Sequence, residues 1–313
     1  KQRAQFELEN ELDLSYSLPE VAHFRVNIYR QKGTIALTLR VVPLTLSTFG
    51  DLHLPVETLE KMCSESRGLI LVSGITGAGK TTTLNLMLNY INQNFAYNIV
   101  TIEDPIEFYH RDVKSSISQR EVGKDTRSYN NALKYVLRQD PDVILIGEMR
   151  DYEAVLAGIT AAETGHLVLG TIHTIDTAQT IDRIIGTFPT FQHDQARIQL
   201  AHVLKGIVAQ RLLPLNEGDG MVPATEILIR TTLIRKLIIE HNWQEMYRAL
   251  EKGDFYGMHT FDQSLIKLYR ENKISLDTVK ENATNVDDLM LKLKGVRSVD
   301  SGSGGPVLDI TRG

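Results

Sequence analysis

The hydrophobic pattern of the chain changes character near Gly68. Before this point, residues 21–46 alternate between apolar and polar positions, which is typical of half-buried β-strands. The apolar positions are Phe24, Val26, Ile28, Ile35, Leu37 and Leu39. Lys32-Gly33 separates the two runs, so the pattern predicts a β-hairpin. Residues 47–55 then form a predicted connector, and a short amphipathic helix is expected to begin near Pro55.

After Gly68, short and wholly apolar segments alternate with segments of helical spacing. The predicted strands are Leu69–Val72, Asn98–Ile102, Val143–Ile146 and Leu167–Ile172, and the predicted helices are Thr82–Asn92, Tyr129–Arg138 and Tyr152–Glu163. Strands that are apolar throughout are buried on both faces. The pattern therefore predicts an α/β fold with a parallel-rich sheet covered by helices.

The last third of the chain is predicted to be mostly helical from about Asp182. The expected helices are Ala196–Leu212, Thr232–His241, Trp243–Lys252 and Asp262–Asn272. Residues 298–313 are rich in serine and glycine, which favours a flexible tail.

The amino-acid composition limits the possible classes of function but adds little to the predicted fold. The 313 residues carry a formal net charge of −5, which disfavours a protein that coats nucleic acid but leaves a local basic channel open. Cys63 is the single cysteine, so no disulfide framework or four-cysteine zinc site can form within the chain, and a reducing compartment is expected. No apolar run reaches the length needed to span a membrane. The chain starts at Lys1, which suggests truncation or processing.

Residues 74–81 read GITGAGKT, a complete P-loop between an apolar strand and a helical segment. Glycines let backbone amides approach phosphates, and a helix N-terminus adds its dipole. Lys80 is expected to reach the β- and γ-phosphates, and the Thr81 hydroxyl to ligate Mg²⁺. The sequence thus predicts binding of ATP with Mg²⁺. The expected nucleotide contacts are Gly74, Thr76, Gly77, Ala78, Gly79, Lys80, Thr81 and Thr82.

Two acidic segments supply candidates for hydrolysis. The apolar strand that begins after Asp142 ends at Glu148, which is expected to organise Mg²⁺ together with Thr81. Residues 101–107 carry three carboxylates after another strand. Glu107 is the preferred candidate for activating water, with Glu103 as the alternative. Alone, such an acidic cluster would be a solvated turn, but beside a P-loop strand it is expected to line the ligand crevice.

Two histidines flank the predicted strand Leu167–Ile172. His173 is a candidate sensor of the γ-phosphate, and His166 could support a neighbouring contact. The alternative is that both are structural or surface residues.

Residues 137–151, LRQDPDVILIGEMRD, closely resemble the signature of the secretion-type AAA-like ATPases. These proteins power type II and type IV secretion and type IV pili. The acidic segment 101–107 and residues 164–174, TGHLVLGTIHT, resemble the acidic and histidine boxes of the same family. The resemblance covers residues 68–212 in unbroken order and extends more weakly over about 20–290.

Within that family, the chain looks most like the branch that retracts type IV pili. Residues 118–123, SQREVG, resemble a segment of that branch. The zinc subdomain that other branches insert after the stretch matching 208–212 has no counterpart, so no zinc is expected. Residues 233–240 resemble a divergent form of the retraction helix. The positions that depart from it are Leu233, Lys236 and Ile239, where the branch typically has alanine, asparagine and arginine.

The resemblance implies a homohexameric ring that hydrolyses MgATP and drives pilus retraction. Each subunit would combine a partial PAS-like domain, 1–46, and a linker, 47–55, with a RecA-like ATPase domain with a helical C-terminal part, 56–297, and the tail. Hinge motion would centre on Pro43–Asp51. The partner would be a pilus platform protein of the inner membrane, contacted peripherally from the cytoplasm.

The resemblance also implies that arginines of the N-terminal domain close over the nucleotide. By alignment these are Arg25 and Arg40, with Arg30 a weaker candidate. A guanidinium suits phosphate because it stays ionised and can bind two oxygens. Read without the family, all three would be solvated charges on a strand face.

Three alternatives remain at this stage. The protein could be a pilus-assembly or type II secretion motor of the same family. It could instead be an accessory paralogue that binds nucleotide and hydrolyses it weakly. A nucleic-acid translocase shares the P-loop fold but is disfavoured by the net charge.

Overall fold

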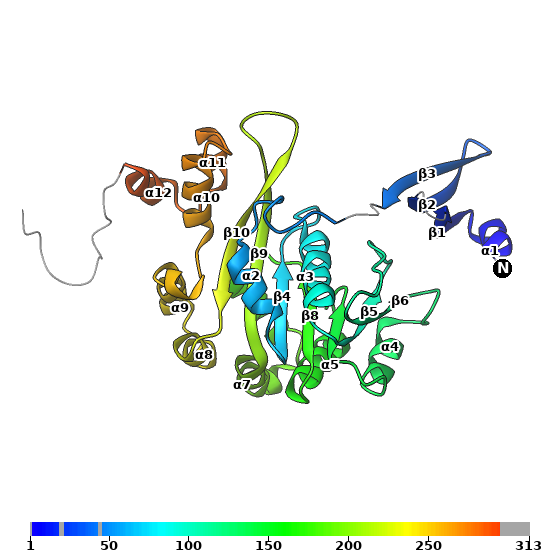
Figure 1. Ribbon diagram of the computed structural model, residues 1–313, viewed down its shortest axis with the longest axis horizontal. Coiled ribbons are helices and arrows are strands. Elements are labelled where there is room, and N and C mark those ends of the chain that lie inside the picture. The colour runs from blue at the N-terminus through cyan, green and yellow to red at the C-terminus, as the bar shows by residue number, and fades with distance from the viewer. Residues whose placement is uncertain (1, 19–21, 43–45, 295–313) are drawn as a thin grey trace, which may run out of the picture.

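The computed structural model describes residues 2–18, 22–42 and 46–294, and these form two separate sheets (Figure 1). The N-terminal sheet is antiparallel, in the order β1-β2-β3, and follows helix α1. The bounds are α1 (Gln2–Glu9), β1 (Glu11–Leu18), β2 (Ala22–Gln31) and β3 (Thr34–Val42). The predicted hairpin is confirmed: Lys32 and Gly33 connect β2 to β3 with φ of 48° and 78°, values that a two-residue hairpin turn requires.

The central sheet has seven strands in the order β10-β9-β4-β8-β7-β5-β6. All neighbouring pairs are parallel except β9 with β10. The strands are β4 (Gly68–Ser73), β5 (Asn98–Glu103), β6 (Ser116–Glu121), β7 (Val143–Ile146), β8 (Leu167–Ile172), β9 (Leu204–Pro214) and β10 (Met221–Ile229). The predicted α/β class with a parallel-rich sheet is therefore confirmed.

Helices cover both faces of this sheet and pack through two apolar cores. One face is covered by α2 (Val56–Cys63) and α3 (Lys80–Asn94). The other is covered by α4 (Tyr129–Val136), α5 (Tyr152–Glu163), α6 (Thr177–Ile185) and α7 (His193–Val203), which leads on from the short η1 (Thr190–Gln192). Successive side chains of a strand point to opposite faces of the sheet. The fully buried strands therefore need an apolar core on each face.

The C-terminal helices extend these layers at the β10 edge of the sheet. Helices α8 (Thr232–Ile239) and α9 (Trp243–Glu251), followed by η2 (Asp254–Tyr256), continue the core on the α5 face. Helices α10 (Phe261–Arg270), α11 (Leu276–Asn282) and α12 (Val286–Leu293) form a third cluster against β9 and β10. Figure 1 places this cluster and the N-terminal sheet at opposite ends of the molecule.

The prediction of one helix over Ala196–Leu212 was wrong. Helix α7 ends at Val203, and the apolar residues that follow form the long strand β9. Strands β1, β6 and β10 were also not predicted. The expected tail at 298–313 lies outside the described residues, as do residues 43–45 of the expected hinge segment Pro43–Asp51.

Among the described residues, no helix is long and apolar enough to cross a membrane.

Candidate functional site

The phosphate-binding loop joins the carboxyl end of β4 to the first turn of α3. Gly77 and Gly79 have φ of 82° and 85°, in the left-handed region where a Cβ is disfavoured. Gly74 has a second constraint, because a Cβ there would lie 2.7 Å from the carbonyl oxygen of Gln210. This backbone places the loop at a helix N-terminus, an arrangement suited to bind anions.

Lys80 is held inside the loop. Its side chain is buried, and Nζ donates to the carbonyl oxygens of Gly74 at 2.9 Å and Ile75 at 3.0 Å. Burial lowers the pKa of Lys80, and the negative charge of Glu148 opposes this shift. The ammonium is thus fixed inside the loop that the sequence predicts to bind the phosphates.

Glu103, at the end of β5, is a buried carboxylate with fixed partners. Its Oε1 accepts from the Thr101 hydroxyl at 2.7 Å and from Gln119 Nε2 at 3.1 Å. Burial raises the pKa of Glu103, with a smaller contribution of the same sign from Glu107. These contacts favour a structural role for the Glu103 carboxylate at the turn that follows β5.

Glu148 and His173 come together although they follow different strands. Glu148 Oε1 contacts Arg150 Nε at 2.5 Å and His173 Nε2 at 3.4 Å. The strands β7 and β8 are parallel neighbours, so their carboxyl ends meet at one edge. The structure therefore brings these two predicted residues to the same place.

The N-terminal sheet reaches the acidic segment through one polar face. Arg25 and Arg40 are cross-strand partners of β2 and β3 and so share this face. Arg25 Nη1 donates to Glu107 Oε1 at 2.6 Å, and the Ser15 hydroxyl lies 3.4 Å from the Glu121 carboxylate. The structure thus joins a predicted arginine to the predicted base.

Arg30 belongs to the opposite face of the same sheet. It pairs with Glu7 at 3.0 Å and lies 5.5 Å over the Phe6 ring. It is therefore tied to α1 and is not brought to the nucleotide loop.

His166 is likewise not brought to the loop. It lies at the amino end of β8, where Nδ1 is 2.9 Å from the carbonyl oxygen of Ala161. The loop lies at the carboxyl end of the sheet, so the suggested supporting contact near the nucleotide does not form.

The loop and the acids enclose a cleft of about 480 Å³, within the range of small-ligand sites. Its lining includes Arg40, Thr76, Gly77, Ala78, Gly79, Lys80, Thr81, Thr82, Glu103, Glu107, Glu148 and His173. The lining also includes residues that the sequence did not predict, among them Asn85, Asp104, Tyr129 and Leu212. Asp104 lay within the acidic segment, but no local pattern marks Tyr129.

The donors in the cleft fit a magnesium ion bound to a triphosphate. Thr81 offers a hydroxyl from the first turn of α3, and Glu148 offers a carboxylate from the end of β7. Mg²⁺ prefers such hard oxygen ligands and keeps several waters.

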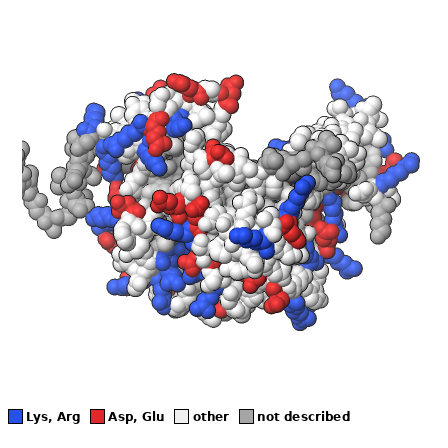
Figure 2. Space-filling model, in the orientation of Figure 1, with Lys and Arg blue, Asp and Glu red and all other residues white. Residues whose placement is uncertain are grey.

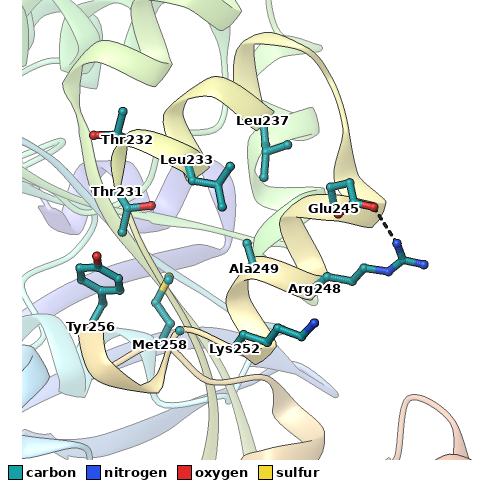
Figure 3. Close-up of a pocket in the computed structure, with 11 residues that line it drawn as sticks. Thr231, Thr232, Leu233, Leu237, Glu245, Arg248, Ala249, Lys252, Tyr256 and Met258 are labelled. Carbon is teal, nitrogen blue, oxygen red and sulfur yellow. Dashed lines mark hydrogen bonds and ion pairs between the residues drawn. The ribbon is translucent and has the colours of Figure 1, made fainter. Parts of the chain in front are cut away.

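A larger cavity of about 940 Å³ lies elsewhere, between α8, α9 and the segment after η2 (Figure 3). Apolar side chains line it, among them Leu233, Leu237 and Met258, and the ion pair of Glu245 with Arg248 lies at its edge. It has no glycine-rich loop at a helix start, so its chemistry does not suit a triphosphate. Leu233, one of the departures from the retraction helix, is about half exposed here.

Comparison with known proteins identifies the family of this chain. The model of the family described as "Type II/IV secretion system protein" matches residues 14–291. The chain belongs to this family. The match spans both sheets, so it includes the arginine-bearing strands as well as the P-loop.

Within the family, the chain is similar to proteins of pilus retraction. It is 43% identical over 288 residues to "Twitching motility protein" of Neisseria gonorrhoeae, covering 92% of this chain and 77% of the relative. It is 43% identical over 283 residues to "Type IV pilus retractation ATPase PilT" of Pseudomonas aeruginosa, covering 90% and 82%. A crystal structure described as the pilus retraction motor PilT with bound ADP superposes with a TM-score of 0.87 at 44% identity, covering 92% and 82%.

Proposed function

We propose that this protein is an ATPase motor that hydrolyses MgATP to drive retraction of type IV pili. The observation that carries the proposal is that one cleft gathers the P-loop, Glu148 and Glu107, with Arg25 in contact with Glu107. The similarity to relatives named for retraction and twitching motility supports the direction of force.

In the proposed site, the amides of residues 74–82 and Lys80 bind the phosphates. Thr81 and Glu148 hold Mg²⁺, which when bound neutralises charge on the phosphates. Glu107 takes a proton from the attacking water. Glu103 stabilises the turn, and it is the alternative candidate for the base.

Two further groups would stabilise or sense the transferring phosphoryl group. Arg25 and Arg40 supply permanent positive charge from the N-terminal sheet. When nucleotide binds, Arg25 exchanges its partner Glu107 for a phosphate. This exchange links the nucleotide state to the position of the N-terminal sheet. His173 responds to the γ-phosphate through its contact with Glu148.

The working form is proposed to be a homohexamer of subunits divided at 1–46, 47–55 and 56–297. Nucleotide binding and release rotate the N-terminal part against the ATPase part, as in hinge closure. The ring acts from the cytoplasm on a platform protein of the inner membrane. Figure 2 shows acidic and basic side chains interspersed on one face, which does not favour a nucleic-acid track there.

Deletion of the gene tests the direction of force. Excess surface pili with lost twitching motility is the result expected for a retraction motor. Absence of pili would instead identify an assembly motor, the reading that the divergent residues Leu233, Lys236 and Ile239 leave open.

A further inference from the structure

Tyr129 lines the catalytic cleft and comes from α4, a helix that carries none of the predicted site residues. It is the first residue of α4, whose start is fixed by the Ser128 side chain accepting from the amide of Asn131. Its ring packs partly against the core between the sheet and the helices α4 and α5. The half-buried phenol is therefore held at the cleft wall by the capped helix start at its backbone and by the core at its ring.

The position of the Tyr129 hydroxyl is defined by Gly147, the residue before Glu148. A Cβ added at Gly147 would lie 2.9 Å from the hydroxyl oxygen and 3.1 Å from the carbonyl oxygen of Ile102. The hydroxyl thus lies where β5 and β7 end, between the turn at Glu103 and the predicted metal-organising carboxylate. Glycine at 147 leaves room for it.

The hydroxyl is available as a hydrogen-bond donor. Across residues 2–18, 22–42 and 46–294, the structure gives it no protein hydrogen-bond partner. Burial raises the pKa of Tyr129, and the charges of Asp104, Glu148 and Glu103 raise it further. The phenol therefore keeps its proton at neutral pH and can donate to an oxygen.

The charged groups that act on this hydroxyl are the carboxylates of Asp104, Glu148 and Glu103, opposed by the guanidinium of Arg150. Asp104, Glu148 and Tyr129 line the same cleft. Polar groups of this kind, separated by more than direct hydrogen-bond distance, are commonly joined by water that makes two to four hydrogen bonds.

We infer that Tyr129 is a positioning residue for hydrolysis, whose hydroxyl donates into the water network shared by Asp104 and Glu148. It holds these two carboxylates in the orientation that the transition state requires. The inference rests on the proposed ATPase function and adds a residue to its site.

Tyr129→Phe tests this role, because it removes only the hydroxyl and keeps the packed ring. We expect kcat to fall about 10-fold, the effect of one lost hydrogen bond near charged groups, with KM for ATP within about 2-fold. Affinity for ADP with aluminium fluoride should fall by the same factor, while affinity for ADP stays unchanged. Tyr135→Phe, on the exposed side of the same helix, is the matched control and should change none of these values.

A double-mutant cycle separates positioning from a general structural effect. In an Asp104→Asn background, Tyr129→Phe should lower kcat less than about 2-fold, because the network is already broken. Full additivity of the two variants, or equal loss of ADP and ADP–aluminium fluoride affinity, would overturn the inference. So would an unchanged kcat in an active wild-type background, whereas an inactive wild-type chain would reject the proposed function itself.

Discussion

The carboxyl edge of the central sheet and the polar face of the N-terminal sheet contribute to one cleft in different ways. At the central edge, Lys80 and Glu103 are buried; Lys80 is hydrogen-bonded to its own loop, and Glu103 to Thr101 of its own strand. On the N-terminal sheet, Arg25 is about 29% exposed and reaches the cleft through a single ion pair with Glu107. We expect the first region to bind the nucleotide and the second to contact it during hydrolysis.

The two faces of the N-terminal sheet sharpen this difference. Its polar face carries Arg25 and Arg40, while Leu37, Leu39 and Val41 on the other face are each more than half exposed. Among the described residues, Arg25 and Ser15 make polar contacts with the ATPase part, and we expect the sheet to move when the Arg25 contact is exchanged. Binding and hydrolysis should therefore be separable by mutation.

The largest expected effect comes from the binding region. Lys80→Ala removes a buried charge beside the phosphates, and a loss of about 4 kcal/mol would lower kcat/KM about 1,000-fold. Nucleotide affinity should fall as well, measured by titration with a fluorescent ADP analogue. Lys280→Ala, at an exposed position of α11, is the control, and wild-type affinity in Lys80→Ala would refute the assigned role.

Glu107→Gln should lower kcat by about 100-fold or more while nucleotide affinity is kept, because a general base is lost without loss of a phosphate ligand. Steady-state ATPase and ADP titration on the same sample measure both. Glu103→Gln is the paired variant. If Glu103→Gln is the inactive one and Glu107→Gln is active, the roles of the two carboxylates must be exchanged.

Arg25→Ala tests the N-terminal region directly. We expect kcat to fall about 30- to 100-fold, as for removal of one preorganised charge donor, with ADP affinity within about 3-fold of wild type. Arg30→Ala, on the other face of the same strand, is the matched control and should hydrolyse ATP normally. Equal effects of the two variants would mean that the two faces of the sheet do not differ in their role in hydrolysis.

The smallest effect concerns the scaffold that supports the binding region. Burial lowers the pKa of His259 to about 4, and its Nε2 lies 2.8 Å from the Thr225 hydroxyl. Its contribution to stability is therefore complete above the unfolded pKa near 6.5 and is lost as the pH falls toward 4.

His259→Gln should remove this pH dependence. Between pH 6.5 and 5.0, the variant should lose about 1.5 kcal/mol less unfolding free energy than the wild type. Urea unfolding at the two pH values measures this, with the exposed His53→Gln as control. The same loss in both proteins would show that His259 is not the group responsible.

Sequence patterns predicted the strands that carry the site better than those at the sheet edge. Buried strands such as Val143–Ile146 are short and bounded by polar residues, so their type was clear. The run from Leu204 onward was assigned to a helix, because a continuous apolar segment next to a real helix has no period to separate the two.

The P-loop and acidic residues could be predicted because their chemistry depends on local order in the chain. Other features depend on pairing between distant segments. Arg25 and Arg30 have different partners because residues five positions apart on β2 lie on opposite faces of the sheet. Tyr129 gains its place from Gly147, which no local pattern connects to it.

The most direct test of the central claim is the number of surface pili on cells that carry Glu107→Gln in place of the native gene. The account predicts excess pili and lost twitching, as in a deletion strain, from a protein that still binds nucleotide. Normal pilus number and motility, with the purified variant unable to hydrolyse ATP, would contradict the claim that hydrolysis in this cleft drives retraction.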